Sequence, residues 1–186
     1  MTEACKSEYF RQERRDVEAV IPKDAMRILD VGCGEGILGR RLLDNGASEV
    51  AGIEFTPDAC EKAKENLTSV ICGDIEGIDL SFDEQYFDCM IFADILEHLK
   101  DPLLTLKKLA KNLSDSGVVV ASIPNVRYYG IINMLAQGRW KYADFGILDR
   151  THLRFFTKKE IETLFTDAGF EITGMTDNID SAYNRL

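Results

Sequence analysis

The sequence predicts an α/β fold, in which a doubly wound, mostly parallel sheet carries helices on both of its faces. Three observations predict it. Short apolar runs rich in β-branched residues recur along the chain, and helical periodicity separates most of them. A glycine-rich loop follows the first run directly. The length of 186 residues and the 45% share of hydrophobic residues fit a single domain, residues 1–186, with a substantial buried core.

Six strands are predicted, because each apolar run is short, β-branched and bounded by turn-forming residues. Strands that alternate with helices pair in parallel, so their carboxyl ends gather at one edge of the sheet. The predicted strands are Arg27–Val31, Glu49–Glu54, Ser69–Cys72, Phe87–Ala93, 117–123 and 170–175.

Capping signals mark the helix boundaries. Thr56 and Asp101 each precede a proline and an apolar helical pattern, which places a cap and a first-turn proline at both helix starts. Residues 157–160 have the spacing of a capping box, and Gly169 is expected to end the helix that follows. A leading helix is expected within residues 1–22.

The charge balance limits the partners. The chain carries 32 acidic against 22 basic residues, a net charge of −10. Because broad binding to nucleic acid or to anionic membrane rests on clustered positive charge, this balance argues against both. No apolar run approaches the roughly 18 residues of a membrane span, and the N-terminus lacks the layout of a signal peptide. A soluble cytoplasmic protein that binds no nucleic acid is therefore expected.

The five cysteines are odd in number, widely spaced and without a C-x-x-C pair. This pattern predicts neither a disulfide framework nor a metal site. Cys60, Cys72 and Cys89 lie in apolar stretches and are expected to be small core residues.

The most informative stretch runs from the first strand through three alternating glycines, Gly32, Gly34 and Gly36, into a helix. Such glycines permit a tight turn and a close approach of the backbone to a ligand, and the helix start offers free N–H groups. Glu54 ends the next strand, where a carboxylate can accept two ribose hydroxyls. Together these features predict a nucleoside ligand at the carboxyl edge of the sheet.

Two nucleoside cofactors remain open at this point. Gly34-x-Gly36-x-x-Gly39 matches the dinucleotide pattern, which keeps an NAD-linked oxidoreductase as an alternative. Against it, Gly32 already ends the strand, and Asp30 before it would place a carboxylate beside a pyrophosphate. The same carboxylate suits a ligand with positive charge, such as the amino group and sulfonium of S-adenosylmethionine.

The motif Asp30-x-Gly32-x-Gly34-x-Gly36 resembles the first signature of the class I S-adenosylmethionine-dependent methyltransferases. Glu54 resembles the second signature, Gly73-Asp74-Ile75 the third, and 93–99 with Asp101-Pro102 the fourth. The resemblance spans about residues 9–175 and implies a Rossmann-like fold, S-adenosylmethionine as cofactor and S-adenosylhomocysteine as product. The cofactor-binding residues that it implies are Asp30, Gly32, Cys33, Gly34, Gly36, Glu54, Phe55, Asp74, Ile75, Ala93 and Asp94.

Two further stretches, 122–126 and 146–157, resemble a bacterial subgroup of this class that accompanies glycosyltransferases in surface-polysaccharide synthesis. This resemblance implies a small-molecule or glycan-precursor acceptor in polysaccharide biosynthesis. Class I sheets usually finish with an antiparallel seventh strand, and only 11 polar residues follow Met175. That strand is therefore expected to be absent, or the chain to be part of a longer protein.

Residues 125–156 follow the fifth predicted strand without a clean period. They carry five cations against two acids, a net charge of +3, and many of the chain's aromatics. We expect an acceptor-site lid whose arginines take a phosphate or carboxylate of the acceptor. The alternative is that the aromatics complete the core and the arginines pair with surface acids. The expected acceptor-binding residues are Arg127, Tyr128, Trp140, Arg150 and Arg154.

Methyl transfer from a sulfonium needs alignment above all, and it needs a base only where the acceptor loses a proton during attack. His98 and His152, the chain's two histidines, are the candidate catalytic bases, with Asp149 as a third choice. A second function stays open, that of a cofactor-binding module without turnover. The acceptor, the methylated atom and the oligomeric state stay open as well.

Overall fold

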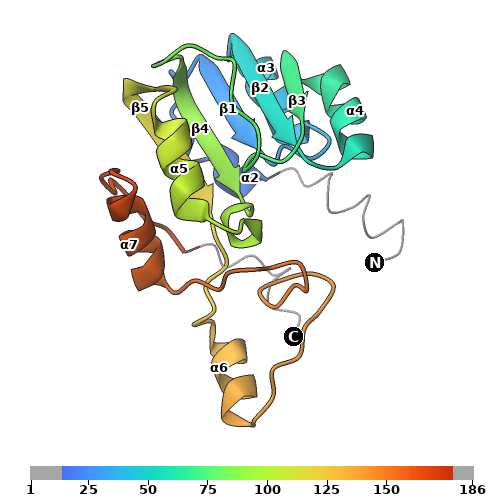
Figure 1. Cartoon of the computed structure of the whole chain (residues 1–186), viewed down its shortest axis with the longest axis vertical. Helices are drawn as coiled ribbons and strands as arrows, with labels where there is room; N and C mark the ends of the chain where they lie inside the picture. Colours follow the sequence, from blue (N-terminus) through green and yellow to red (C-terminus); the bar gives the residue numbers. More distant parts are fainter. Residues whose placement is uncertain (1–13, 178–186) are drawn as a thin grey trace. The chain divides into compact units, whose positions relative to one another are not determined.

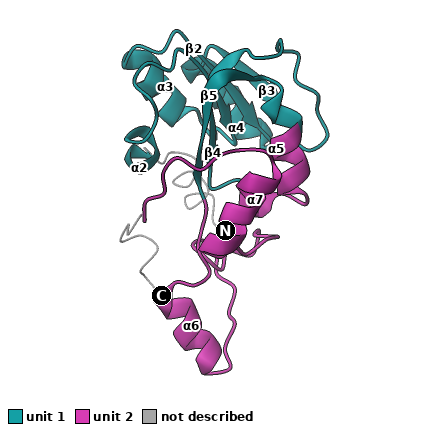
Figure 2. Ribbon diagram, turned by 90° about the vertical axis from the view of Figure 1, so that its left-hand side faces the viewer, with its two compact units in different colours: residues 1–95, 108–122 teal, residues 96–107, 123–186 magenta. Residues whose placement is uncertain are grey.

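The computed structural model describes residues 14–177, which fall into two compact units (Figure 2). Among the described residues, the first unit holds 14–95 and 108–122, and the second holds 96–107 and 123–177. Most of the leading helix predicted within residues 1–22 lies outside the described residues. The described part contains the short helix α2 (Arg15–Glu18).

The first unit is built on a five-stranded parallel sheet with the order β3-β2-β1-β4-β5 (Figure 1). This sheet confirms the predicted α/β, Rossmann-like class, and the first four strands have the predicted bounds. Its strands are β1 (Arg27–Val31), β2 (Glu49–Glu54), β3 (Ser69–Cys72), β4 (Phe87–Ala93) and β5 (Leu113–Ser122).

Helices connect β1 to β2, β2 to β3 and β4 to β5, whereas residues 73–86 between β3 and β4 contain no helix. The helices predicted after Thr56, Asp101 and Thr157 begin there, but the Thr56 and Thr157 side chains make no capping hydrogen bond. Helix α3 (Ile37–Asp44) packs against β2, and α4 (Pro57–Asn66) packs against β2 and β3. Helix α5 (Pro102–Ala110) precedes β5, and the Asp101 carboxylate caps it by accepting the Leu104 N–H at 2.8 Å. The strand order reverses between β1 and β4, the switch point at which open α/β sheets bind their ligands.

The central strands are nearly continuous apolar runs in the sequence because they lie in the core. Leu29, Val31, Cys89 and Ile91 are fully buried, since strands in the middle of a parallel sheet are covered on both faces. Asp30 lies among them with only 2% of its surface exposed. Burying an ionised carboxylate costs free energy unless a partner compensates its charge, so Asp30 marks the carboxyl edge of β1 as a candidate site.

The sixth predicted strand is wrong. Within residues 14–177, residues 170–175 form no strand, and Ile172 and Met175 are exposed. Helix α7 (Lys158–Asp167) ends as predicted at Gly169, whose φ is +94°, and Phe170 N–H then donates to the Phe165 carbonyl. An apolar run becomes a strand only where a neighbouring edge takes its backbone hydrogen bonds, and no described strand offers that edge here.

The second unit contains a helix that the sequence analysis missed, α6 (Tyr129–Ala136), together with α7 and the 3₁₀ turn η1 (Leu96–His98). The two ends of the predicted lid, residues 125–156, are joined, because the Val126 N–H donates to the Phe156 carbonyl at 2.8 Å. It has a small apolar core of its own, formed by Ile131, Ile147 and Leu148 with Val126, Tyr128, Met134 and Phe155 around them. No helix among the described residues is long and apolar enough to cross a membrane.

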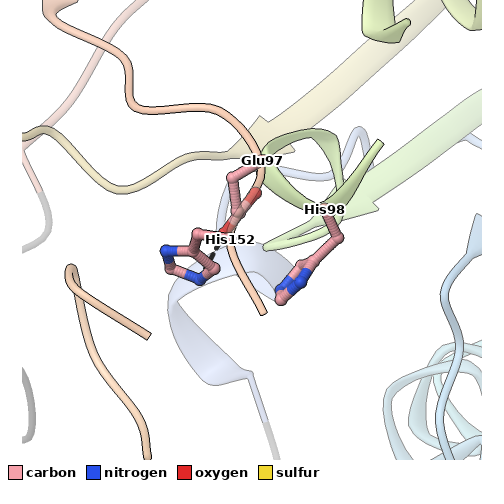
Figure 3. Close-up of side chains that lie close together, drawn as sticks. All are labelled: Glu97, His98 and His152. Carbon is pink, nitrogen blue, oxygen red and sulfur yellow. Dashed lines mark ion pairs between the residues drawn. The ribbon is translucent and has the colours of Figure 1, made fainter. Parts of the chain in front are cut away.

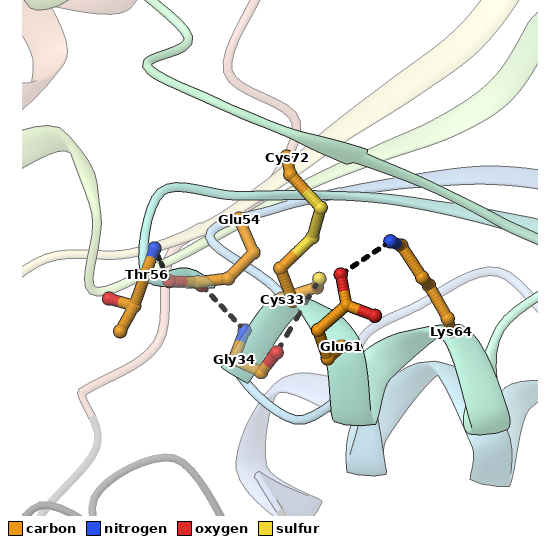
Figure 4. The surroundings of a disulfide bond; sticks show 8 residues. Cys33, Gly34, Glu54, Thr56, Glu61, Lys64 and Cys72 are labelled. Atoms are coloured by element: carbon orange, nitrogen blue, oxygen red, sulfur yellow. Dashed lines mark hydrogen bonds and ion pairs between the residues drawn. A yellow bond between two sulfur atoms is a disulfide. The ribbon is translucent and has the colours of Figure 1, made fainter. Parts of the chain in front are cut away.

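One pair of cysteines differs from the prediction. Cys60 and Cys72 form a disulfide, with Cα atoms 5.8 Å apart, whereas no disulfide was predicted and Cys72 was expected in the core (Figure 4). Cys72 ends β3 opposite Glu54 of β2 and is exposed, while Cys60 is fully buried on α4. The pairing depends on how α4 folds back onto β3, which the spacing of cysteines in the sequence does not reveal.

This disulfide predicts a redox-dependent stability. Closing a loop of 12 residues should stabilise the fold by about 3 kcal/mol, so a reductant should lower the melting temperature by about 5–10 °C. Cys72→Ser should melt lower than the oxidised wild type and should no longer respond to the reductant. Thermal melts with and without dithiothreitol, with non-reducing peptide mapping of Cys60 to Cys72, measure this. A wild-type melt that ignores the reductant would contradict it.

Candidate functional site

The glycine loop makes a tight connection from β1 into α3. Gly32, Gly34 and Gly36 all have positive φ, and the Gly32 and Cys33 N–H groups donate to the Ile53 carbonyl at 2.8 and 3.1 Å. A Cβ on Gly32 would lie 2.9 Å from the Ile95 side chain, so only glycine fits that position without displacement. The loop therefore brings bare backbone to the carboxyl edge of the sheet.

Glu54 anchors this loop. Its Oε2 accepts the Gly34 N–H at 3.0 Å and its Oε1 accepts the Thr56 N–H at 2.7 Å, with the residue 6% exposed (Figure 4). A carboxylate offers about four acceptor positions, so two remain for hydroxyl donors. The predicted ribose-binding position and the structural anchor of the glycine loop are thus the same side chain.

A small pocket of about 60 Å³ opens beside Glu54. Its lining is mostly apolar, which suits the faces of a nucleoside, with one carboxylate at the edge for polar contacts. Ile95 belongs to this lining and was missed by the sequence analysis, because a single isoleucine after a strand carries no signal of its own. The lining residues are Val31, Gly32, Ile53, Glu54, Phe55, Ile75 and Ile95.

The turn that carries Asp74 and Ile75 is held by a lysine far away in sequence. The Asp74 side chain accepts the Glu76 N–H at 2.9 Å, and Ile75 is buried. Lys108 Nζ on α5 donates to the carbonyls of Ile75 and Ile78, the second at 2.8 Å. Lys108 therefore fixes the position of a turn that lines the pocket, although it lies outside the family motifs.

Lys108→Met should keep the stem of the side chain and lose these donors. We expect cofactor affinity to fall about 3- to 10-fold, because the turn at Ile75 becomes mobile while the pocket's other walls stay in place. Lys107→Met, on the exposed side of the same helix, is the matched control and should bind normally. Isothermal calorimetry with both variants measures the difference, and equal affinities would refute the role of Lys108.

Charged groups meet where β1 and β4 end. Arg14 Nη1 lies 2.8 Å from Asp94 Oδ2, and the Ser122 hydroxyl donates to Asp94 Oδ1 at 2.7 Å. Burial raises the pKa of Asp30 to about 7, with the Glu54 charge adding to the rise and the Arg14 charge opposing it. Arg14 is a second residue that the motifs do not identify. Arg14 also bonds Asp16, with Nη2 and Oδ2 3.2 Å apart, so its guanidinium bridges two carboxylates beside Asp30 and Glu54.

Two of the predicted cofactor-binding residues, Cys33 and Ala93, have side chains that pack in or against the core of the first unit. The Cys33 side chain belongs to the core of the first unit, where burial raises the pKa of its thiol, so this thiol stays protonated. Ala93 pairs with Ser122 at the end of β4 and packs against the same core. Their backbones lie in the loop and strand end that form the predicted site.

The second unit brings both predicted catalytic histidines together. His98 and His152 pack edge to face with ring centroids 4.7 Å apart, and Glu97 Oε1 lies 3.8 Å from His152 Nε2 (Figure 3). Glu97 is 1% exposed and the His152 side chain 7%. One ligand atom from each residue falls within 4.8 Å of the others, so these three side chains could also hold a metal ion.

The hydrogen bonds of the two rings define their tautomers. His98 Nδ1 lies 3.2 Å from the Thr151 carbonyl, and His152 Nδ1 lies 3.1 Å from the Ile147 carbonyl. Because a carbonyl oxygen only accepts, each neutral ring carries its proton on Nδ1 and presents the lone pair of Nε2. Both rings can therefore accept a proton at Nε2.

The predicted acceptor-binding residues have different surroundings. Arg154 donates to the Lys100 carbonyl, and Arg150 bonds Asp144 at 2.8 Å, which holds the pKa of Asp144 below its usual value. Trp140 packs its ring edge to face against Phe155, Tyr128 borders the small core, and Arg127 is exposed.

A second hollow, of about 380 Å³, lies in this unit and is large enough for part of a small molecule. Two cations and one acid contribute to its wall, and Arg150 is the only predicted acceptor-binding residue there. Its lining residues are Met134, Lys141, Tyr142, Ala143, Asp144 and Arg150.

Comparison with known proteins gives one consistent result. A family model described as "Methyltransferase domain" matches residues 6–174. A protein of Cereibacter sphaeroides named "Ubiquinone biosynthesis O-methyltransferase" is 25% identical over 178 residues, covering 90% of this chain and 71% of that protein.

Two solved structures share the fold. One is described as a SAM-dependent methyltransferase from Archaeoglobus fulgidus, with a TM-score of 0.66 at 21% identity, covering 89% of this chain and 69% of the other. The second, from Thermotoga maritima, is described as a possible histamine N-methyltransferase, with a TM-score of 0.67 at 21% identity, covering 88% and 72%.

Proposed function

The chain belongs to the S-adenosylmethionine-dependent methyltransferases, and we propose that it methylates a hydroxyl oxygen of a small-molecule or glycan-precursor acceptor. The family and its cofactor set aside the dinucleotide alternative. The named relative is an O-methyltransferase of ubiquinone biosynthesis, and the two stretches at 122–126 and 146–157 resemble enzymes that accompany surface-polysaccharide synthesis. Both acceptor classes offer a hydroxyl group.

The residues of the first unit suit the cofactor. The two acceptor positions left on Glu54 suit the ribose hydroxyls, and the apolar side chains of Ile75 and Ile95 beside it suit contact with a face of the adenine. The methionine part is a zwitterion, and the site offers acids and a guanidinium for its two charges. We assign the amino group to Asp30 and Asp94 and the carboxylate to Arg14. When bound, the cofactor supplies a methyl group on a positively charged sulfur, an excellent leaving group.

The Glu97–His98–His152 cluster carries the proposal of oxygen as the methylated atom. A hydroxyl must lose its proton as it attacks, and His98 Nε2 can take that proton. The hydrogen bond of the His98 ring is exposed and that of the His152 ring is partly buried, so we assign His98 as the base and His152, beside Glu97, as its positioning partner.

The acceptor is proposed to carry an anionic group. The hollow of the second unit presents Lys141 and Arg150 together, and Asp144 compensates only one of these charges. Phosphate or carboxylate would fit two such cations. A sugar nucleotide and an aromatic acid with a free hydroxyl both have this combination of groups.

The test is methyl transfer from labelled S-adenosylmethionine to a panel of sugar nucleotides, lipid-linked sugars and hydroxylated quinol precursors, with amine acceptors for comparison. His98→Asn should lower kcat at least about 100-fold on a hydroxyl acceptor and leave cofactor affinity unchanged. His152→Asn should retain more activity and shift the pH profile of kcat/KM, since it acts through His98. A chelator arm tests whether the same cluster works through a metal ion.

Methylation of amines alone, or full activity of His98→Asn on a hydroxyl acceptor, would refute the proposed base. Turnover on none of the acceptors, with normal cofactor binding, would favour a binding module for this chain.

A further inference from the structure

Helix α6 is apolar on nearly every side. On one side Ile131 is buried, with Tyr128 and Met134 beside it in the small core of the second unit. The rest of the helix faces outward, with Tyr129 77%, Ile132 50% and Leu135 54% exposed. Asn133 is its only strongly polar side chain, and the helix carries no charge. Such a distribution is typical of helices covered by protein or by lipid.

Helix α6 is too short to span a bilayer but long enough to lie on its surface. Its eight residues extend about 12 Å, far short of the roughly 30 Å of a bilayer core. A short helix with an exposed apolar side can instead lie along the membrane surface, with that side among the headgroups and the upper acyl chains. Aromatic rings and cations beside the helix are the usual companions of this arrangement.

Both companions are present next to α6. Arg127 precedes it, and Arg139 and Trp140 follow it, and all three are exposed. Nearby acids do not cancel these cations: Asp144 is bonded to Arg150, and Asp149 is 4% exposed and accepts the Thr151 N–H and hydroxyl. Counted with both acids, the segment 125–156 has a net charge of +3 in a chain whose net charge is −10.

We propose that this surface docks the protein on an anionic lipid bilayer. The α6 surface consists of Arg127, Tyr129, Ile132, Leu135, Arg139 and Trp140. Charge selects the occupant, because anionic headgroups attract the two arginines, whereas the same surface on a second copy carries the same two arginines and would repel them. The acidic composition argues against broad membrane binding, and this surface is the local exception to it.

The experiment uses Trp140, the chain's single tryptophan, as the reporter. Vesicles of phosphatidylcholine alone are compared with vesicles containing phosphatidylglycerol, in the absence of cofactor and acceptor. With the anionic vesicles we expect co-sedimentation, a blue shift of the Trp140 emission, quenching by brominated lipid, and loss of binding at high salt. With pure phosphatidylcholine we expect little binding.

Two variant pairs separate the contributions. Ile132→Ser/Leu135→Ser should weaken binding at least about tenfold, and Arg127→Gln/Arg139→Gln about 25-fold, roughly fivefold per charge near an anionic surface. Leu104→Ser and Lys158→Gln/Lys159→Gln remove exposed groups of the same kinds elsewhere and should bind like wild type.

Absence of vesicle binding by the wild type would overturn the proposal. So would a dimer in solution, seen by light scattering without lipid, that the Ile132→Ser/Leu135→Ser pair abolishes, because the surface would then be a protein interface. Neither result tests methyl transfer, which is measured separately, without vesicles, on the water-soluble sugar nucleotides of the panel.

Discussion

Replacing Glu54 is expected to abolish most of the cofactor affinity. Glu54→Ala removes the two acceptor positions proposed for the ribose and the anchor of the glycine loop at once. A hydrogen bond to a charged group contributes about 1.5–3 kcal/mol, and two that share one carboxylate contribute less than twice that, so binding of S-adenosylmethionine should weaken by about 2–4 kcal/mol, roughly 30- to 1000-fold. Calorimetric titration with the cofactor measures this directly.

The same substitution should also destabilise the protein without cofactor. The Gly34 and Thr56 N–H groups lose their acceptor at a position that is buried, since Glu54 is only 6% exposed. We therefore expect the free energy of unfolding to fall by about 1–3 kcal/mol. Urea denaturation measures it.

Glu54→Gln tests the same side chain at unchanged size, because an amide keeps one acceptor oxygen and turns an NH₂ group toward one of the two backbone donors. It should lose affinity nearly as fully as Glu54→Ala. Glu49→Gln, at the opposite end of β2, is the matched control and should bind the cofactor like wild type. Unchanged affinity in both Glu54 variants would exclude the ribose assignment.

The parts of the site that could be predicted are those with a local signal. The bounds of the first four strands follow from short apolar runs, whereas β5 begins at Leu113, four residues before its predicted start. The turn at Gly32–Gly36 follows from the spacing of backbone-permissive glycines, and the position of Glu54 from its place at a strand end. Each of these features depends on residues close together in the sequence or on strict alternation of strand and helix.

The missed parts depend on long-range packing. Arg14 reaches Asp94 across 80 residues, and Lys108 reaches Ile75 across 33. The Cys60–Cys72 disulfide likewise needs the return of α4 over β3. None of these contacts has a pattern in sequence, because any lysine or arginine on a helix could point elsewhere.

Helix α6 was missed for a different reason. Sequence analysis finds helices through the contrast between an apolar and a polar side, and α6 has almost no polar side. The predicted strand at 170–175 shows the reverse error, in which a contrast is present but no neighbouring strand edge in the described part receives it. Periodicity therefore reports amphipathic elements and is silent about the apolar surface proposed to meet lipid.

Asp30 is expected to make both stability and cofactor binding depend on pH. Its pKa of about 7 in the folded protein lies above the ordinary value of 3.8, so the folded state holds a proton that the unfolded chain has already released. Stability from this group is complete below about pH 4 and falls by about 1.4 kcal/mol per pH unit until pH 7. Asp30→Asn should therefore be more stable than wild type at pH 8 and equal to it at pH 4, as measured by urea denaturation.

Cofactor binding should have the opposite dependence. A cationic ligand favours the ionised carboxylate, so the affinity of wild type for S-adenosylmethionine should rise with pH up to about pH 7, with proton release on binding. Asp30→Asn should bind more weakly at pH 8 and should lose that dependence. S-adenosylhomocysteine keeps the amino group but lacks the sulfonium charge, so its smaller pH dependence would report how much of the effect comes from the sulfonium. Calorimetry in buffers of different ionisation enthalpy counts the protons. Equal proton release by wild type and Asp30→Asn would show that another group titrates and that Asp30 does not bind the cofactor's charge.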